Sequence, residues 1–441
     1  MRIVLDRRVL RLVLITAIVV TIIGFVIDLY NTIDYPGTDL RNRVVGARLM
    51  LEGIDPYFFK WQPELSERFY DPLDIPTELV SKLSVPPTVL VLHSIFAKLP
   101  YLTQKIIWLF VQWAAFIGTV SIFIKTSSSQ TKTNLILIVA FLFANSLFWR
   151  FHVNSGQIYI VYIFLLSIAW LFLKQRFNLN LFWGGIFAGI AVSLRPSFIL
   201  FFLAFIIGKK YLFVLGGALG AIFSVVLTLP VAGKLIWQRY ILTMLGMTGF
   251  IDLRAYAPFE ESHASNSNIV YPKITEGFDF SVRNPLESYL DNTSFYDILN
   301  AIDIPNKRYI LVVGFAIAII LLSLYIWKFV CQNQNIELLF LWGIVTCIIG
   351  EFFIPVGRYS YYDIQMILPL LAAIDLANVK DSIYQKRLGI LLLGLLLSIV
   401  GFIIVPRAMF FSVFLILSYI ILISLMLTNQ NNRATKRAWK T

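Results

Sequence analysis

The sequence predicts an all-α, polytopic membrane protein with about twelve transmembrane helices. Three observations lead to this fold class. Of the 441 residues, 58% are hydrophobic and 14% are charged, which is far more apolar than a soluble domain of this size. The mean hydropathy is +0.77. Thirteen apolar runs follow one another along the chain, most of them long enough to cross about 30 Å of hydrocarbon.

The net charge of +12 indicates how the chain is oriented in a membrane, and it does not indicate nucleic-acid binding. The basic residues occupy short loops between apolar runs, without a basic stripe that carries interleaved aromatic residues. The two cysteines, Cys331 and Cys347, have no metal-ligand partner at short spacing. Neither a disulfide framework nor a zinc site is therefore expected. Membrane lipids remain as partners, and nucleic acid does not.

The charges at the two ends of the chain predict the topology. The first eleven residues carry four arginines, at the start of an apolar run from Val9 to Leu29, and the C-terminal tail carries four bases and no acid. Both termini are therefore expected in the cytoplasm, which requires an even number of crossings. The weakest run, Val85 to Leu99, opens with two prolines and contains His93 and Lys98, so we expect it to be juxtamembrane or re-entrant. Twelve crossings remain.

With this topology the chain forms a single integral membrane domain, residues 1–441, without an internal repeat. Residues 30–105 are expected to form the first outer loop with juxtamembrane helices, and residues 232–308 a long outer loop. The short basic loops then lie inside and the polar clusters meet outside. We expect a multi-pass protein of the cytoplasmic (inner) membrane with its active site on the outer face.

The first outer loop begins with a polar helix, TDLRNRVVGARLMLEGIDPY, at residues 38–57. Thr38 or Asp39 is expected to cap it, since a short side-chain oxygen accepts bonds from first-turn amides. Its apolar residues recur at helical spacing beside a charged face, so the helix is expected to lie along the membrane interface and to end at Gly53. Arg48 and Glu52 stand one turn apart and can pair, and Asp39 would pair with Arg43 if it only caps the helix.

Five short motifs follow one another along the chain: Asp39, ARLMLEGIDPY at 47–57, Pro86-Pro87, Gly156-Gln157 and AGIAVSLRP at 188–196. Their order and spacing resemble glycosyltransferase family 87, which belongs to the GT-C class and includes polyprenol-phosphate-mannose-dependent mannosyltransferases. The resemblance covers residues 1–230 well and the rest by hydropathy only. Three positions depart from the family's pattern: Val85 replaces an aromatic residue, Arg195 replaces a lysine, and GRYSYYD at 357–363 replaces a histidine-rich motif.

The resemblance implies an inverting glycosyltransferase. It would move a hexose or pentose, mannose by preference, from a polyprenyl-phosphate-linked donor to a lipid-linked or glycan acceptor on the outer face. Asp39 matches the acidic residue of the first outer loop that acts as general base in GT-C enzymes. Inversion requires one carboxylate to accept the proton of the attacking hydroxyl. From the residues alone, the other interpretation of Asp39 is a helix-cap acid paired with Arg43.

The leaving group would be a phosphate, so positive charge is expected around its oxygens. Arg195 is the first candidate, because an arginine within an apolar run is costly and its planar fork fits phosphate; the alternative is an arginine that snorkels from a helix end. Residues 154–157 have a second interpretation as the cap of the following helix. Further phosphate candidates are Arg150, His152 and Arg358. Expected substrate contacts are Asn154, Gln157, Glu52, Asp55, Tyr57, His263, Asn266 and Tyr362.

No cofactor is expected. A divalent metal held by Asp39 together with Glu52 or Asp55 is the minority interpretation. Two other classes of function stay open. A lipid-linked glycan polymerase or ligase also needs a large outer loop and several arginines, but not the early acid. A lipid or sugar flippase, or a secondary transporter, usually shows inverted repeats, which this sequence lacks.

Overall fold

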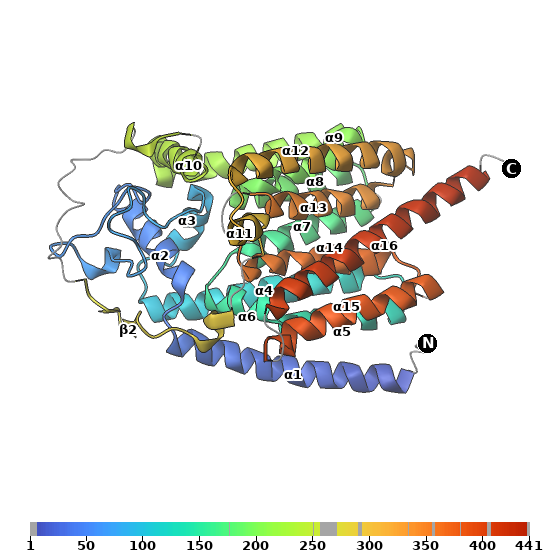
Figure 1. Ribbon diagram of the computed structural model, residues 1–441, viewed down its shortest axis with the longest axis horizontal. Coiled ribbons are helices and arrows are strands. Elements are labelled where there is room, and N and C mark those ends of the chain that lie inside the picture. Colours follow the sequence, from blue (N-terminus) through green and yellow to red (C-terminus); the bar gives the residue numbers. More distant parts are fainter. Residues whose placement is uncertain are drawn as a thin grey trace.

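Long apolar helices lie side by side and form most of the molecule (Figure 1). Six of the described helices are long and apolar enough to cross a membrane, and a bent pair, α5 (Gln130–Ala144) and α6 (Leu147–Asn154), makes a seventh if it counts as one span. The chain is therefore a multi-pass membrane protein. The six are α1 (Arg7–Asp34), α4 (Tyr101–Thr126), α10 (Tyr211–Met247), α12 (Lys307–Tyr325), α15 (Ser382–Val400) and α16 (Ala408–Ala438). The computed structural model describes residues 7–175, 177–249, 251–255, 271–289, 293–333, 335–354, 358–379, 381–403 and 407–438.

Length and composition do not give the expected twelve crossings within the described residues. The reason is that several apolar runs form short or broken helices, whereas a straight span needs about 20 residues. Three have 15 to 17 residues: α7 (Tyr159–Lys174), α8 (Asn180–Leu194) and α13 (Ile336–Phe352). Two more are interrupted by 3-10 turns: η2 (Pro196–Leu200) leads into α9 (Phe201–Ile207), and η8 (Ser360–Met366) into α14 (Ile367–Leu376).

The core lies where α7, α13 and α14 pack inside the bundle. Of the 17 residues of α13, 14 are buried, and Trp170 of α7 contacts Phe340 of α13 with ring centroids 5.1 Å apart. The short helices are thus covered by longer ones. The remaining described turns are η1 (Glu67–Phe69), η3 (Leu253–Ala255), η5 (Pro285–Tyr289), η6 (Ile326–Val330), η7 (Cys331–Asn333) and η9 (Gly401–Ile403).

Helices α8 and α10 pack closely because both present glycines at their contact. A methyl group on Gly185 or Gly189 would strike a backbone carbonyl of α10, and one on Gly216 or Gly220 would strike a carbonyl of α8. Small residues let two backbones approach in this way inside a membrane. The packing fixes the end of α8, which is followed directly by Arg195.

The segment expected to form the first outer loop, residues 30–105, gathers at one end of the bundle (Figure 1), and we call it the outer segment. It contains α2 (Thr38–Leu51) and α3 (Pro87–Ser94), and α3 has only eight residues, far too few to cross. The start of α1 and the end of α16 lie at the opposite end of the bundle (Figure 1).

The first part of the expected long loop 232–308 is helical. Helix α10 continues to Met247 through a break at Gly233, whose φ of 69° and ψ of 165° are not helical. Beyond the break, Ile236 and Tyr240 pack on the outer segment. Further on, a two-stranded antiparallel hairpin and a short helix are described: β1 (Ile274–Thr275), β2 (Phe278–Asp279) and α11 (Phe295–Ala301).

Helix α2 is buried on nearly all sides, so its charged face is packed against protein and is not exposed. Arg41, Arg43 and Arg48 are at most 4% exposed, as are most of the apolar residues between them. Neither Thr38 nor Asp39 caps the helix, because its N-cap is Gly37, with a φ of 74° and no side-chain cap. The expected end is confirmed: α2 stops at Leu51, and Gly53 follows with a φ of +73°.

Candidate active site

Asp39 lies in the first turn of α2 and is partly exposed. The side-chain amide of Gln157 donates a hydrogen bond to Asp39 Oδ2, and the Gln157 Oε1 accepts one from Arg43 Nη2. Gln157 therefore stands between the acid and the base, and the expected Asp39 to Arg43 ion pair is not among the described salt bridges. The cap interpretation of residues 154–157 is also wrong, because α7 has no side-chain cap.

The turn that carries Gln157 is held against α2 by backbone contacts. Gly156 has a φ of +65°, and a Cβ there would lie 2.5 Å from the Cβ of Leu40, so only glycine fits. Its carbonyl accepts hydrogen bonds from Arg43 and from Trp108 Nε1, the latter at 2.8 Å. Gln112 Nε2 donates to the carbonyl of Gln157 at 2.9 Å. These bonds position the Gln157 amide on Asp39.

Burial raises the pKa of Asp39 above its ordinary value of 3.8. Four neighbours act in the other direction and lower this pKa: the charge of Arg43, a hydrogen bond from Tyr361, the charge of Lys82 and the hydrogen bond from Gln157. Desolvation is the largest effect, so the net shift is upward. A carboxylate with a raised pKa is a stronger proton acceptor than an exposed aspartate, which is what a general base needs.

A group of tyrosines connects Asp39 to Arg195. Tyr361 hydrogen-bonds Asp39 and stacks on Tyr159, with ring centroids 6.1 Å apart. Tyr159 also contacts Tyr362, at 5.0 Å. The guanidinium carbon of Arg195 lies 4.7 Å from the centroids of both Tyr159 and Tyr362. One aromatic cluster thus separates the carboxylate from the arginine, and both stay partly exposed.

Arg195 is oriented by Glu351, a residue that the sequence analysis missed. Arg195 Nη2 lies 3.0 Å from Glu351 Oε1, and Nη1 donates to the Tyr159 hydroxyl at 3.1 Å. Ser197 Oγ donates to the same carboxylate oxygen at 3.1 Å. The Arg195 side chain keeps 22% exposure, whereas that of Glu351 has 3%. An acid within an apolar helix is itself a signal of function, and that signal was available in the sequence.

The family model of glycosyltransferase family 87 matches residues 85–350, which is more than half of the chain. This chain belongs to glycosyltransferase family 87. It is accordingly a glycosyltransferase, and the resemblance drawn from the motifs is confirmed. No curated protein and no solved structure matches the chain.

The match to family 87 lies further along the chain than the expected range 1–230. It includes Gln157 and Arg195 but begins after Asp39 and ends before Glu351 and Arg358. The matched segment therefore contains only part of the site, and Asp39, Glu351 and Arg358 lie outside it. Asp39 contacts the matched segment by accepting a hydrogen bond from Gln157, and Glu351 by accepting one from Arg195.

Two other residues expected at the donor phosphate of this family 87 enzyme, Arg150 and His152, are engaged elsewhere. Arg150 forms an ion pair with Asp28 and donates to the Gly24 carbonyl at 2.6 Å. His152 is buried, and its Nε2 accepts from the backbone amide of Ile160 at 3.2 Å. Among the described interactions, neither side chain contacts Asp39 or Arg195.

Arg358 joins the Glu351 side of the site. Its Nη1 lies 2.6 Å from Asp363 Oδ1 and donates to Thr293 Oγ1 at 2.7 Å, while its Nε lies 4.0 Å from Glu351 Oε2. The Arg358 side chain is 3% exposed. Arg195 and Arg358 therefore hold the same carboxylate from two sides, with Arg195 the more open of the two.

The expected substrate contacts divide into three groups. Gln157 and Tyr362 belong to the site just described, and Asn154 lies near the same turn with both side-chain amide atoms buried and without a hydrogen-bond partner in the described chain. Glu52, Asp55 and Tyr57 follow the far end of α2, where Glu52 is about 20 Å from Asp39 at 1.5 Å of rise per residue. His263 and Asn266 lie outside the described residues.

Asp55 and Tyr57 are tied into the outer segment. Asp55 Oδ2 lies 3.4 Å from Arg239 Nε, and Asp55 Oδ1 accepts from the Tyr57 amide at 2.9 Å. The Tyr57 ring is fully buried, and its hydroxyl donates to the Val85 carbonyl at 2.8 Å. These contacts link the end of α2 to α10 and to the segment before α3.

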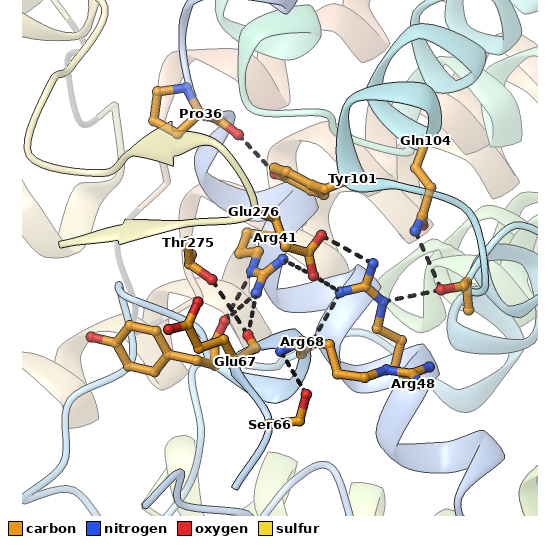
Figure 2. Close-up of polar contacts among 12 residues, drawn as sticks. Pro36, Arg41, Arg48, Ser66, Glu67, Arg68, Tyr101, Gln104, Thr275 and Glu276 are labelled. Atoms are coloured by element: carbon orange, nitrogen blue, oxygen red, sulfur yellow. Dashed lines mark hydrogen bonds and ion pairs between the residues drawn. The ribbon is translucent and has the colours of Figure 1, made fainter. Parts of the chain in front are cut away.

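Glu276 at the tip of the β hairpin clamps two arginines of α2 (Figure 2). It lies 3.3 Å from Arg41 Nη1 and also pairs with Arg48, so Arg48 does not form the expected pair with Glu52. Arg41 Nε also donates to the Tyr70 carbonyl at 2.9 Å, and Arg48 Nε to the Ala97 carbonyl at 3.0 Å. The long outer loop is thereby fastened to the helix that carries Asp39.

The described residues contain no group of three or more histidine, cysteine, aspartate and glutamate side chains placed to hold a metal ion. Asp39, Glu52 and Asp55 in particular do not converge, since Glu52 and Asp55 follow the opposite end of α2. The arrangement offers one partly exposed carboxylate and one partly exposed guanidinium, joined by tyrosines. Such a pair can accept a proton at one end and stabilise an anion at the other.

Proposed function

We propose that this family 87 glycosyltransferase moves a sugar from a polyprenyl-phosphate-linked donor, with inversion, to a lipid-linked or glycan acceptor. A hexose or pentose is expected, and mannose is favoured by the family resemblance. The observation that carries the proposal is the placement of Asp39, a carboxylate of raised pKa that shares one tyrosine cluster with Arg195.

In the proposed reaction, Asp39 Oδ accepts the proton of an acceptor hydroxyl while that oxygen attacks C1 of the donor sugar. The bond from C1 to the phosphate oxygen breaks, and its electron pair leaves with the polyprenyl phosphate. Arg195 stabilises the negative charge that develops on the leaving phosphate, because a guanidinium fork matches two phosphate oxygens. Glu351 acts as a positioning residue, since it holds the Arg195 fork at 3.0 Å.

The arginines supply the charge that a metal would otherwise supply, so we propose that no cofactor takes part. Arg358 supports this role by sharing the Glu351 carboxylate with Arg195. Removing one preorganised donor of this kind from an active site typically costs about 10² to 10³ in rate.

The raised pKa of Asp39 predicts an acidic limb in the rate of transfer. A base must be deprotonated, so kcat/KM for a polyprenyl-phosphate sugar should fall as pH falls through the Asp39 pKa, at a pH above the ordinary value of 3.8. Because the charge of Lys82 lowers this pKa, Lys82→Ala should move the limb to higher pH. The measurement is the pH profile of purified protein, with the exposed Lys98→Ala as control. A limb that Lys82→Ala leaves in place, or moves to lower pH, contradicts the assignment.

The same proposal places both termini in the cytoplasm and the active site on the outer face of the cytoplasmic membrane. The short loops rich in lysine and arginine support this orientation. In a chain with Cys331 and Cys347 replaced by serine, a cysteine at the exposed position Glu64, or in residues 270–300, should react with an impermeant thiol reagent added to intact cells. A cysteine at Ser128, or after residue 430, should react only after permeabilisation. Labelling of a cysteine at Ser128 in intact cells would contradict this orientation.

A further inference from the structure

A cavity of about 470 Å³ lies beside α2 in the outer segment. Its size falls within the range of about 300 to 1,000 Å³ that is usual for small-molecule sites. One wall is aromatic: the ring centroid of Trp61 lies 4.7 Å from that of Tyr70, and Tyr70 and Tyr271 stack at 6.1 Å. Trp61 and Tyr271 stay partly exposed, while Tyr70 is buried. Tyr271 comes from the long outer loop, so two distant segments build this wall.

Asp71 and Asp74 line the same cavity, together with the exposed Glu64. Asp71 is 9% exposed, and its described side-chain hydrogen bond is the one it accepts from the Leu73 amide at 3.0 Å. Burial raises the pKa of Asp71 to about 6. Asp74 is held by Lys60 Nζ at 2.9 Å. An ionised carboxylate offers about four acceptor positions, so Asp71 keeps capacity for donors from a ligand.

The cavity follows the face of α2 that begins with Asp39. Asn42, Gly46 and Leu49 line it, and Asp39 stands three residues before Asn42, which is the spacing of neighbours on one helix face. The axial rise between these two residues is about 4.5 Å. Lys82 also lines the cavity, and its positive charge lowers the pKa values of both Asp39 and Asp71. One end of the cavity is therefore next to the proposed base.

A sugar ring fits a cavity with an aromatic wall and a buried carboxylate better than a phosphate group or an acyl chain does. The axial C–H bonds of a pyranose carry slight positive charge and pack on the negative face of an aromatic ring, and its hydroxyls donate hydrogen bonds to carboxylates. A phosphate group would be repelled by Asp71, and an acyl chain would offer this carboxylate no donor.

We propose that this cavity binds a sugar ring of the glycan acceptor and presents one of its hydroxyls to Asp39. The proposal rests on the proposed transferase function, and it adds that the acceptor is recognised through carbohydrate and not only through lipid. Trp61 supplies the stacking face and Asp71 the hydroxyl acceptor.

The test is saturation-transfer NMR on the full chain in phosphatidylcholine nanodiscs, which avoid sugar-based detergents. The probes are methyl α-mannoside, methyl α-glucoside and methyl α-galactoside. We expect transfer to at least one probe in the wild type, a loss in Asp71→Asn, and binding about two- to tenfold weaker in Trp61→Ala, which is the range for removing one aromatic contact. Trp61→Phe should retain part of the signal, which separates stacking from folding. Trp183→Ala, an exposed tryptophan on α8, is the matched control.

The measurement does not depend on turnover, so it separates this inference from the proposed function. Asp39→Asn protein should bind the same probe as the wild type. Probe binding at wild-type strength in Trp61→Ala and Asp71→Asn, or its absence from the folded wild type, overturns the acceptor site even if the enzyme transfers sugar. Weaker binding in Trp61→Ala and loss of binding in Asp71→Asn, with wild-type binding in Trp183→Ala, support it even if Asp39→Asn is still active.

Discussion

Asp39→Asn is expected to lower the rate of sugar transfer by about 10² to 10⁴ while donor binding stays close to that of the wild type. The amide keeps the size of the side chain and one oxygen that can accept from Gln157, as the Asp39 Oδ2 does now. It cannot accept a proton at neutral pH. The measurement is single-turnover transfer by purified protein with a polyprenyl-phosphate sugar and saturating acceptor.

Glu78→Gln is the matched control for this experiment, because Glu78 is an exposed carboxylate of the same outer segment. It should transfer sugar at the wild-type rate. Thermal unfolding of Asp39→Asn should remain near that of the wild type, since one partly exposed hydrogen bond contributes about 0.5 to 1.5 kcal/mol to a chain of this size. An Asp39→Asn protein with wild-type activity would reduce Asp39 to a residue that only orients Gln157.

Arg195→Ala should lower transfer by about 10² to 10³ and weaken donor binding, whereas Arg195→Lys should retain part of both. A lysine keeps the charge but loses the fork that Glu351 holds at 3.0 Å. The measurement is kcat and KM for the donor, measured separately. Arg254→Ala, which removes an exposed arginine of the long outer loop, should leave both constants unchanged.

Loss of Arg195 also leaves the buried Glu351 with fewer partners, so folding must be separated from donor recognition. Removing one partner of a buried pair typically costs about 3 to 5 kcal/mol. The double variant Arg195→Ala with Glu351→Gln removes that unpaired charge and should recover stability without recovering transfer. If Arg195→Ala alone folds and transfers sugar at the wild-type rate, Arg195 only snorkels from its helix end. Arg358 is then the next candidate to bind the donor phosphate.

Local sequence rules predicted the start of the site but not its partners. Asp39, the helix that follows it and the stop at Gly53 could be read from residue spacing. The absence of an Asp39–Arg43 pair could not be predicted, because Gln157, which is 118 positions from Asp39 in the sequence, hydrogen-bonds both side chains. Contacts of this range depend on how α2, α4 and α6 pack, and no helix-surface rule contains that information.

The burial of α2 was hidden for the same reason. Arginines at helical spacing are typical of a solvated face, yet Arg41 and Arg48 are buried because loop carbonyls and Glu276 reach them. The hairpin that supplies Glu276 lies more than 200 positions further along the chain. The count of twelve crossings is not confirmed within the described residues, because apolar runs show hydrophobicity but not that a 3-10 turn such as η2 divides one of them.

The stereochemistry of a single transfer tests the central claim most directly. Purified wild-type protein is given an anomerically pure polyprenyl-phosphate sugar, and the configuration at C1 of the product is assigned by NMR. Direct attack by a hydroxyl that Asp39 deprotonates predicts the opposite anomer, with polyprenyl phosphate released in equal amount. Retention at C1 would require a covalent glycosyl-enzyme intermediate, and it would contradict a base-assisted single displacement at this site.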